Sequence, residues 1–110
     1  MGLLKFQNVG ISGLAAAVPR KIVCNLDPNP YFSAEDVREV VEKIGVRERR
    51  FADQNTCSSD LCFVAAERLI SEMKLEREEI DLLIFISQTP DYRMPATSIL
   101  LQERLKLPTS

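Results

Sequence analysis

Three cysteines are the side chains of this sequence whose type suggests covalent or metal chemistry. Cys24, Cys57 and Cys62 are an odd number for a set of disulfides, and their spacings fit no common metal-binding pattern. The sequence contains no histidine, the commonest general base and the commonest metal ligand in proteins. A Cys/His or Ser/His pair therefore cannot form within these 110 residues. We expect no catalytic residue and no metal site among them.

Arginine occupies three of four consecutive positions, at Arg47, Arg49 and Arg50. The planar guanidinium group suits bidentate contacts to phosphate, so this run could form an anion site. A charged run on a protein surface is commonly just solvated, without any ligand. The sequence by itself leaves both interpretations open.

The element that must position a site is the apolar run at residues 82–86. It is too short to cross a membrane and does not alternate, which predicts a strand covered on both faces in the middle of a parallel sheet. Polar residues follow at 87–89, and Pro90 and Pro95 bracket a short loop. Because ligands of open α/β sheets collect outside the carboxyl ends of the strands, we expect this loop to border any site.

Glycine and proline divide the amino-terminal part of the sequence. Residues 3–17 alternate apolar with polar or small side chains and predict a strand, with close backbone approach at Gly10 and Gly13. The two glycines are no dinucleotide-binding fingerprint, since a third glycine is missing and Pro19 opposes the helix that should follow. Residues 18–32 are rich in proline, asparagine and aspartate and predict an irregular connector.

Three helices are expected after this connector. The first has a cap at Ser33 and another at Gly45. The second runs from cap candidates at residues 56–59 to about Met73, and the third spans about 96–106. The residues expected to face the core are Val37, Val40, Val41 and Ile44 in the first helix, Cys62, Ala66, Leu69, Ile70 and Met73 in the second, and Leu101 and Leu105 in the third.

The expected order is strand, helix, helix, strand, helix, which is an incomplete α/β layer in one domain over residues 1–110. Two strands cannot form a parallel sheet covered on both sides. We therefore expect the chain to be the amino-terminal piece of something larger, truncated before its sheet is complete. The net charge of −2 gives no electrostatic footprint for nucleic acid. No signal peptide or membrane-length run is present, so a cytoplasmic location is the default expectation.

Several segments together resemble a known family. Gly45-Val-Arg-Glu-Arg49 is similar to the Gly-Ile-Arg-Glu-Arg signature of β-ketoacyl-acyl carrier protein synthase III, a member of the thiolase superfamily. The stretch Asn55-Thr-Cys-Ser-Ser59, the apolar run and the loop Thr89-Pro-Asp-Tyr-Arg-Met-Pro95 follow in the same order and at similar spacing. The resemblance covers essentially the whole sequence, and it implies a thiolase-like layered fold.

The resemblance implies a homodimeric acyltransferase that starts fatty acid synthesis. In this reaction an acyl group passes from coenzyme A to a cysteine, and the carbanion from malonyl-acyl carrier protein then attacks the thioester. Acyl-coenzyme A and the acyl carrier protein are the implied partners, and no further cofactor is implied. The family's nucleophile follows the strand expected after Ser110, and its histidine and asparagine come later. The resemblance therefore gives this chain no catalytic residue, because Cys24, Cys57 and Cys62 stand elsewhere.

The resemblance also suggests three positions near substrates. Lys43 matches a family arginine near the adenine and phosphate end of coenzyme A, so Lys43 and Arg47 are the candidate coenzyme A contacts. Glu39 stands where well-known members place a tryptophan that stacks on adenine, and a carboxylate cannot stack. Met94 matches an aromatic residue that reaches into the partner subunit's acyl pocket, where a flexible methionine would leave room for a starter other than acetyl. Burial of Met94 at a dimer seam is the alternative.

Two other functions remain open. Glu39 favours a related ketosynthase that loads an unusual acyl group. The second alternative is a non-catalytic α/β interaction module, because a fold does not fix a function. With exposed sheet edges and an uncovered apolar face, the isolated chain is expected to associate.

Overall fold

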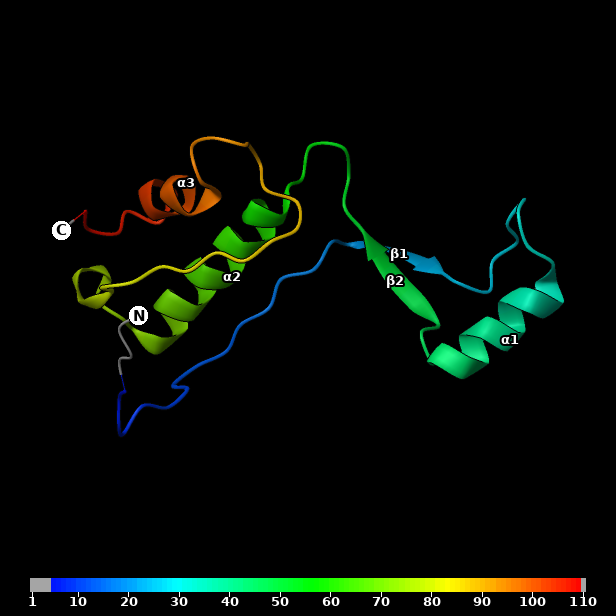
Figure 1. Cartoon of the computed structure of the whole chain (residues 1–110), viewed down its shortest axis with the longest axis horizontal. Helices are drawn as coiled ribbons and strands as arrows, with labels where there is room; N and C mark the ends of the chain where they lie inside the picture. The colour runs from blue at the N-terminus through cyan, green and yellow to red at the C-terminus, as the bar shows by residue number, and fades with distance from the viewer. Residues whose placement is uncertain (1–4, 110) are drawn as a thin grey trace.

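The computed structural model describes residues 5–109. Figure 1 shows two groups of elements joined by extended segments, with α1 and a small hairpin on one side and the other helices on the opposite side. The elements are β1 (Lys21–Cys24), α1 (Ala34–Ile44), β2 (Glu48–Phe51), α2 (Ser58–Met73), the 3-10 helix η1 (Arg77–Glu79) and α3 (Thr97–Arg104).

Helix α1 has the expected start and end. The Ser33 hydroxyl oxygen accepts a hydrogen bond from the Asp36 backbone N–H at 3.1 Å, which satisfies one of the free donors of the first turn. Gly45 ends the helix in the left-handed region at φ 73°, where its N–H donates to the Val41 carbonyl at 2.9 Å. Val41 is buried and Val37 is half-buried, as predicted. The prediction that Val40 and Ile44 face the core was wrong, because they are 52% and 59% exposed. The prediction of this helix and of both caps is confirmed.

The sheet is an antiparallel pair of strands, which the sequence did not predict. Strand β1 pairs with β2 so that Lys21 lies opposite Phe51 and Cys24 opposite Glu48. Asn25 extends the pairing, since its backbone N–H donates to the Arg47 carbonyl at 2.8 Å. The prediction of an irregular connector over 18–32 was therefore wrong at residues 21–24, while the rest of that segment is irregular as predicted, and the expected order of elements was wrong. Strand β1 has only four residues, which is too short to show a periodic pattern, and its partner lies far along the sequence. The prolines on either side, Pro19 and Pro28, are typical of irregular segments.

The main core lies between α2, α3 and the segments that flank them. Asp60, three residues into α2, accepts the Cys57 backbone N–H at 2.9 Å, so the helix begins after Cys57. The predicted threonine and serine caps were one or more positions off. The core side chains are Ile70, Leu105 and Leu107, with Phe63, Ala66, Ile80 and Leu83 packed against them. Leu101 and Leu105 are buried as predicted.

Two further predictions concern the surface of α2. A Cβ atom at Gly13 would lie 2.9 Å from Leu69 Cδ1 and would also collide with Met73, so the predicted close approach at Gly13 is confirmed. Nothing lies within 4 Å of the same position at Gly10, so the predicted close approach was wrong there. Cys62 is exposed, contrary to the prediction that it faces the core, because the face of α2 that packs inward is centred on Ile70.

The apolar run at 82–86 crosses α2 in extended form but belongs to no sheet (Figure 1). Leu83 and Phe85 are half-buried on one side, whereas Leu82, Ile84 and Ile86 are 75%, 70% and 90% exposed. The prediction of a strand covered on both faces was therefore wrong. Within residues 5–109, helices pack on one face of this segment and no element covers the other. The described residues 5–17 likewise form no strand, although 3–17 was predicted to be one.

The molecule has an open shape, which leaves apolar surfaces such as that of residues 82–86 uncovered. The radius of gyration is 19.1 Å, against roughly 13 Å for a compact domain of this length. Within residues 5–109, none of the helices has the length and apolar character that a membrane span needs.

Candidate functional site

The loop after the apolar run is bound to the start of α2. The Ser58 hydroxyl donates to the Thr89 carbonyl at 3.1 Å and lies 3.3 Å from the Ser87 hydroxyl. The Thr89 backbone N–H donates to the Ser87 hydroxyl oxygen at 3.0 Å, which closes the turn. The polar residues predicted to border a site therefore meet the amino end of a helix, where backbone N–H groups carry a partial positive charge.

Asp91 connects this loop to two helices. Its carboxylate Oδ2 accepts a hydrogen bond from the Ser59 hydroxyl at 2.5 Å, and its backbone N–H donates to Thr97 Oγ1 at 3.2 Å. Ser59 is 1% exposed and Thr97 is 3% exposed, and both lie in the first turns of their helices. The sequence analysis missed this cluster. Its only signal was an aspartate with hydroxyl residues at the starts of two predicted helices.

A second charged group lies beside this cluster. Arg104 of α3 forms an ion pair with Asp60 at 2.9 Å, and its guanidinium carbon lies 4.5 Å from the centre of the Phe63 ring. The Cys57 backbone N–H holds the pKa of Asp60 below its ordinary value, and Arg104 adds to this effect, while burial opposes it. A hollow of about 440 Å³ opens here, lined by Cys57, Asp60, Asp91, Tyr92, Leu100, Glu103 and Arg104.

Met94 lies at the far end of the loop and is 86% exposed. The described residues therefore cover little of the Met94 side chain. Its assignment to an acyl pocket across a dimer stays a prediction.

The structure does not bring the two candidate coenzyme A contacts into one hollow. Lys43 Nζ forms an ion pair with Glu39 at 2.5 Å along the exposed face of α1. Arg47 lines a hollow of about 410 Å³ with Arg38 and Glu42, and Lys43 is not among the residues that line it. The roles of Lys43 and Arg47 therefore stay predictions, and Lys43 has a carboxylate partner.

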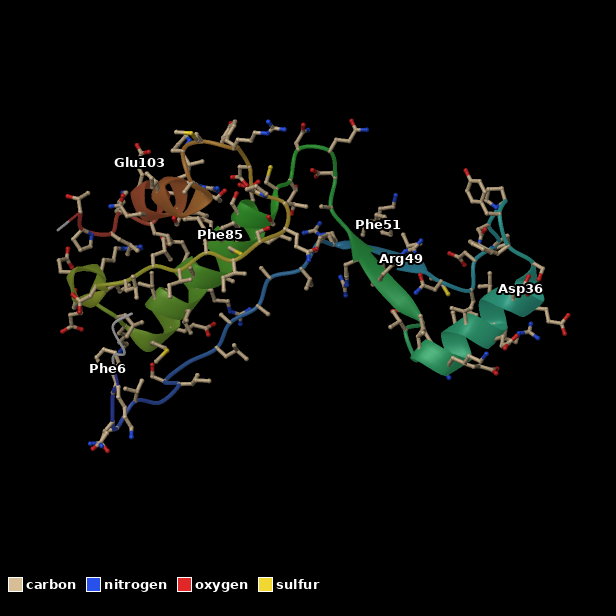
Figure 2. The ribbon with its side chains drawn as sticks, in the orientation of Figure 1. Phe6, Asp36, Arg49, Phe51, Phe85 and Glu103 are labelled. Atoms are coloured by element: carbon tan, nitrogen blue, oxygen red, sulfur yellow. The ribbon has the colours of Figure 1, made fainter. Side chains whose placement is uncertain are left out.

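The other two arginines of the run contact the protein itself. Arg49 Cζ lies 5.0 Å from the centre of the Phe51 ring on the same strand (Figure 2). Arg50 donates to the backbone carbonyls of Pro19 and Arg20 at 3.2 and 3.3 Å. These contacts favour a structural role for both side chains, which leaves Arg47 as the candidate anion contact of the run.

The cysteines do not come together as a site. Cys24 is half-buried, Cys57 and Cys62 are exposed, and all three are free thiols. Over residues 5–109 no cluster of histidine, cysteine or carboxylate side chains is suited to hold a metal ion.

No family model matches the chain. Among curated proteins, the β-ketoacyl-[acyl-carrier-protein] synthase III of Desulfitobacterium hafniense strain Y51 is 40% identical over 98 residues, which cover 89% of this chain and 29% of the relative. The protein of the same name from Symbiobacterium thermophilum is 37% identical over 102 residues, which cover 93% of this chain and 31% of the relative. The chain thus spans about a third or less of the length of these relatives.

Solved structures agree with the sequence matches. The 3-oxoacyl-(acyl-carrier protein) synthase of Burkholderia xenovorans LB400 superposes with a TM-score of 0.79 at 45% identity, over 88% of this chain and 29% of that one. The chain matches the amino-terminal portion of β-ketoacyl-acyl carrier protein synthase III. The synthase III of Thermus thermophilus gives a TM-score of 0.77 at 36% identity, over 90% of this chain and 30% of that one.

The similarity extends beyond synthase III. OleA of Xanthomonas campestris gives a TM-score of 0.72 at 26% identity, over 94% of this chain and 33% of that one. The predicted thiolase-like α/β fold class is confirmed by these neighbours, and so is the resemblance to synthase III.

Proposed function

We propose that residues 1–110 form the amino-terminal part of an acyltransferase that condenses an acyl-coenzyme A starter with malonyl-acyl carrier protein. The observation that carries this proposal is the 40% identity over 98 residues to a synthase III, together with the TM-score of 0.79 to a 3-oxoacyl-(acyl-carrier protein) synthase. We further propose a homodimer in the cytoplasm, with acyl-coenzyme A as substrate and no additional cofactor.

The contribution of this chain to the reaction is to hold substrates rather than to react with them. Its free thiols lie outside the polar loop at 87–91, and it contains no histidine. The loop is fixed to the starts of α2 and α3, and Met94 extends from it. On this proposal the thiolate, the general base and the oxyanion donors come from other residues of the enzyme.

The test uses the complete product of the gene that encodes these residues. The protein is incubated with malonyl-acyl carrier protein and acyl-coenzyme A donors of increasing chain length, and the 3-oxoacyl product is detected by mass spectrometry. We expect product with at least one donor and release of carbon dioxide in equal amount. If no product forms with any donor, the proposal is contradicted and a non-catalytic module is favoured.

The coenzyme A contacts are tested separately. Because Glu39 neutralises Lys43 in the structure, we expect Lys43→Gln to change the KM for acyl-coenzyme A little and Arg47→Gln to raise it about tenfold. The matched control is Arg68→Gln, which breaks an exposed pair with Glu72 of the same i, i+4 type on α2. A larger effect of Lys43→Gln than of Arg47→Gln would contradict this assignment.

A second candidate within the superfamily is a ketosynthase that loads an unusual acyl group. Glu39 and Met94 favour this candidate. The Glu39 carboxylate forms an ion pair with Lys43, and the Met94 side chain is exposed and flexible. The same assay distinguishes the two candidates, since an acetyl-loading enzyme prefers the shortest donor and the alternative prefers a longer or branched one.

A further inference from the structure

Positive charge is concentrated on the hairpin of β1 and β2. The whole chain has a net charge of −2, whereas residues 19–24 and 46–51 carry five cationic side chains and one acidic one, a net charge of +4. These six side chains, all exposed, are Arg20, Lys21, Arg47, Arg49, Arg50 and Glu48. Each strand has four residues and is only about 13 Å long, comparable with a Debye length of about 8 Å, so the fields of these charges add.

The register of the hairpin separates its acidic residue from two of the cations. Lys21 lies opposite Phe51, and Val23 lies opposite Arg49. Because opposed residues and alternate residues of a strand share one face of a sheet, these four side chains lie on the same face. Glu48 lies on the other face. We call the face of Lys21, Val23, Arg49 and Phe51 the cationic face, since the hairpin supplies it with two cations and no carboxylate.

The contacts of the hairpin arginines hold their guanidinium groups in place without neutralising them. Arg49 Cζ lies 5.0 Å from the centre of the Phe51 ring (Figure 2). Arg50 donates through Nη1 to the backbone carbonyls of Pro19 and Arg20. The ion pairs within residues 5–109 are all formed by other residues. A charged group that is already fixed loses less side-chain entropy on binding, so the hairpin is prepared to bind an anionic partner.

The composition of the cationic face favours a protein as this partner. Phe51 is 43% exposed beside Arg49, and aromatic residues and arginine are enriched in protein–protein interfaces. Binding to nucleic acid depends on many phosphate contacts along the backbone, and a short face with two cations offers few. An acidic protein surface complements both the charge and the small size of this face.

We propose that the cationic face is the docking surface for the acyl carrier protein, which would meet it with an acidic patch. This inference rests on the proposed function, in which the carrier is the protein substrate. The face attracts the carrier and orients it, and none of its residues touches the reacting atoms. Attraction between complementary charges acts mainly on the rate of association, and salt weakens it.

Steady-state kinetics of the complete gene product test the docking surface. In the double variant Lys21→Glu, Arg49→Glu, kcat/KM for malonyl-acyl carrier protein should fall at least about tenfold at low salt, and added salt should shrink this loss. In a ping-pong reaction each substrate has its own kcat/KM, so the value for acyl-coenzyme A should stay within about twofold of wild type. The double variant with glutamine at both positions should give an intermediate loss. The control is Arg68→Glu on α2, an exposed charge reversal outside the hairpin, which should leave both values unchanged.

Two results would overturn the docking surface while leaving the proposed function intact. One is an unchanged kcat/KM for malonyl-acyl carrier protein in the glutamate double variant. The other is an equal loss for both substrates, because the face would then serve the coenzyme A nucleotide or the fold.

A binding measurement decides the docking surface even if the wild-type enzyme forms no product, a result by which the proposed function itself fails. Fluorescence anisotropy of labelled holo-acyl carrier protein, titrated with the complete gene product, measures the dissociation constant. We expect the glutamate double variant to raise it at least about tenfold and Arg68→Glu to leave it unchanged. No binding by the wild type, or equal binding by the double variant, would overturn the inference.

Discussion

Replacing Ile84 by lysine should strongly weaken self-association of the 110-residue chain. Leu82, Ile84 and Ile86 form an apolar surface on one side of the extended run, with 75%, 70% and 90% of each residue exposed. Covering all three would contribute roughly 3–7 kcal/mol per copy, and two copies that face each other contribute twice this amount. That gain is of the same size as the roughly 4–15 kcal/mol that association costs.

Lysine at position 84 removes one third of this apolar surface and adds a charge that would have to leave water. The desolvation of an ammonium group costs several kcal/mol, so the dissociation constant should rise at least about 100-fold. Light scattering and sedimentation velocity over a concentration series measure the change. Val40→Lys on α1 is the matched control, because Val40 is also an exposed apolar residue but lies in the other group of elements (Figure 1).

The result that would refute this reasoning is a wild-type chain that remains monomeric at its highest soluble concentration. Equal effects of Ile84→Lys and Val40→Lys would also refute it, because association would then depend on general hydrophobicity and not on this surface.

Three further outcomes follow from the core and its ion pairs. Leu105→Ala should lower the free energy of unfolding by about 2–5 kcal/mol in chemical denaturation, since the side chain is 2% exposed and its loss leaves a cavity; a loss below 1 kcal/mol would contradict its place in the core. The hydrogen bonds that Arg77 donates to Glu67 at 2.9 and 3.0 Å hold the pKa of Glu67 below its ordinary value. The stability from this pair should be fully present above the ordinary glutamate pKa and lost as the pH falls through the lowered value, so Arg77→Gln should flatten the acid limb of a stability–pH curve; an unchanged limb would contradict the pair's contribution. Gly13→Ala should destabilise the protein, and Met73→Ala should relieve part of that loss because it removes the nearer of the two side chains that the new Cβ meets, while Leu69 remains; strict additivity in the double variant would contradict the contact with Met73.

Local rules in the sequence predicted the helices well. Ser33 and Gly45 define α1 because capping depends on residues within four positions of each other. Leu101 in α3 and Leu105 at its carboxyl-terminal cap are buried because their spacing of four residues places them on the same side. A glycine within an apolar segment commonly marks a tight contact, and this rule held at Gly13 but failed at Gly10.

Long-range features were not predictable in the same way. Pairing of Lys21 with Phe51 depends on two short segments far apart in sequence, and neither has enough residues to show a periodic pattern. The apolar composition of residues 82–86 predicts burial, but burial depends on which elements pack against each face. Cys57 precedes α2 although cysteine is not a preferred cap, and the Asp60 carboxylate compensates.

The location of the candidate site stays a prediction, and the contacts within it were not predicted. The loop after the apolar run meets the start of α2, a contact that the sequence analysis did not predict. The bond between Asp91 and Ser59 joins residues 32 positions apart, so no local pattern reveals it. Lys43 differs, because its pair with Glu39 has the local i, i+4 spacing of helical ion pairs, although its charge was predicted to face a ligand.

The central claim is that these residues belong to an acyl-condensing enzyme whose reactive thiol is none of Cys24, Cys57 and Cys62. Peptide mapping by mass spectrometry, after the complete gene product is incubated with an accepted acyl-coenzyme A, tests it directly. We predict a single thioester-linked acyl group on a cysteine outside residues 1–110. An acyl group on any of these three cysteines, or no acyl group with any donor, would contradict the account.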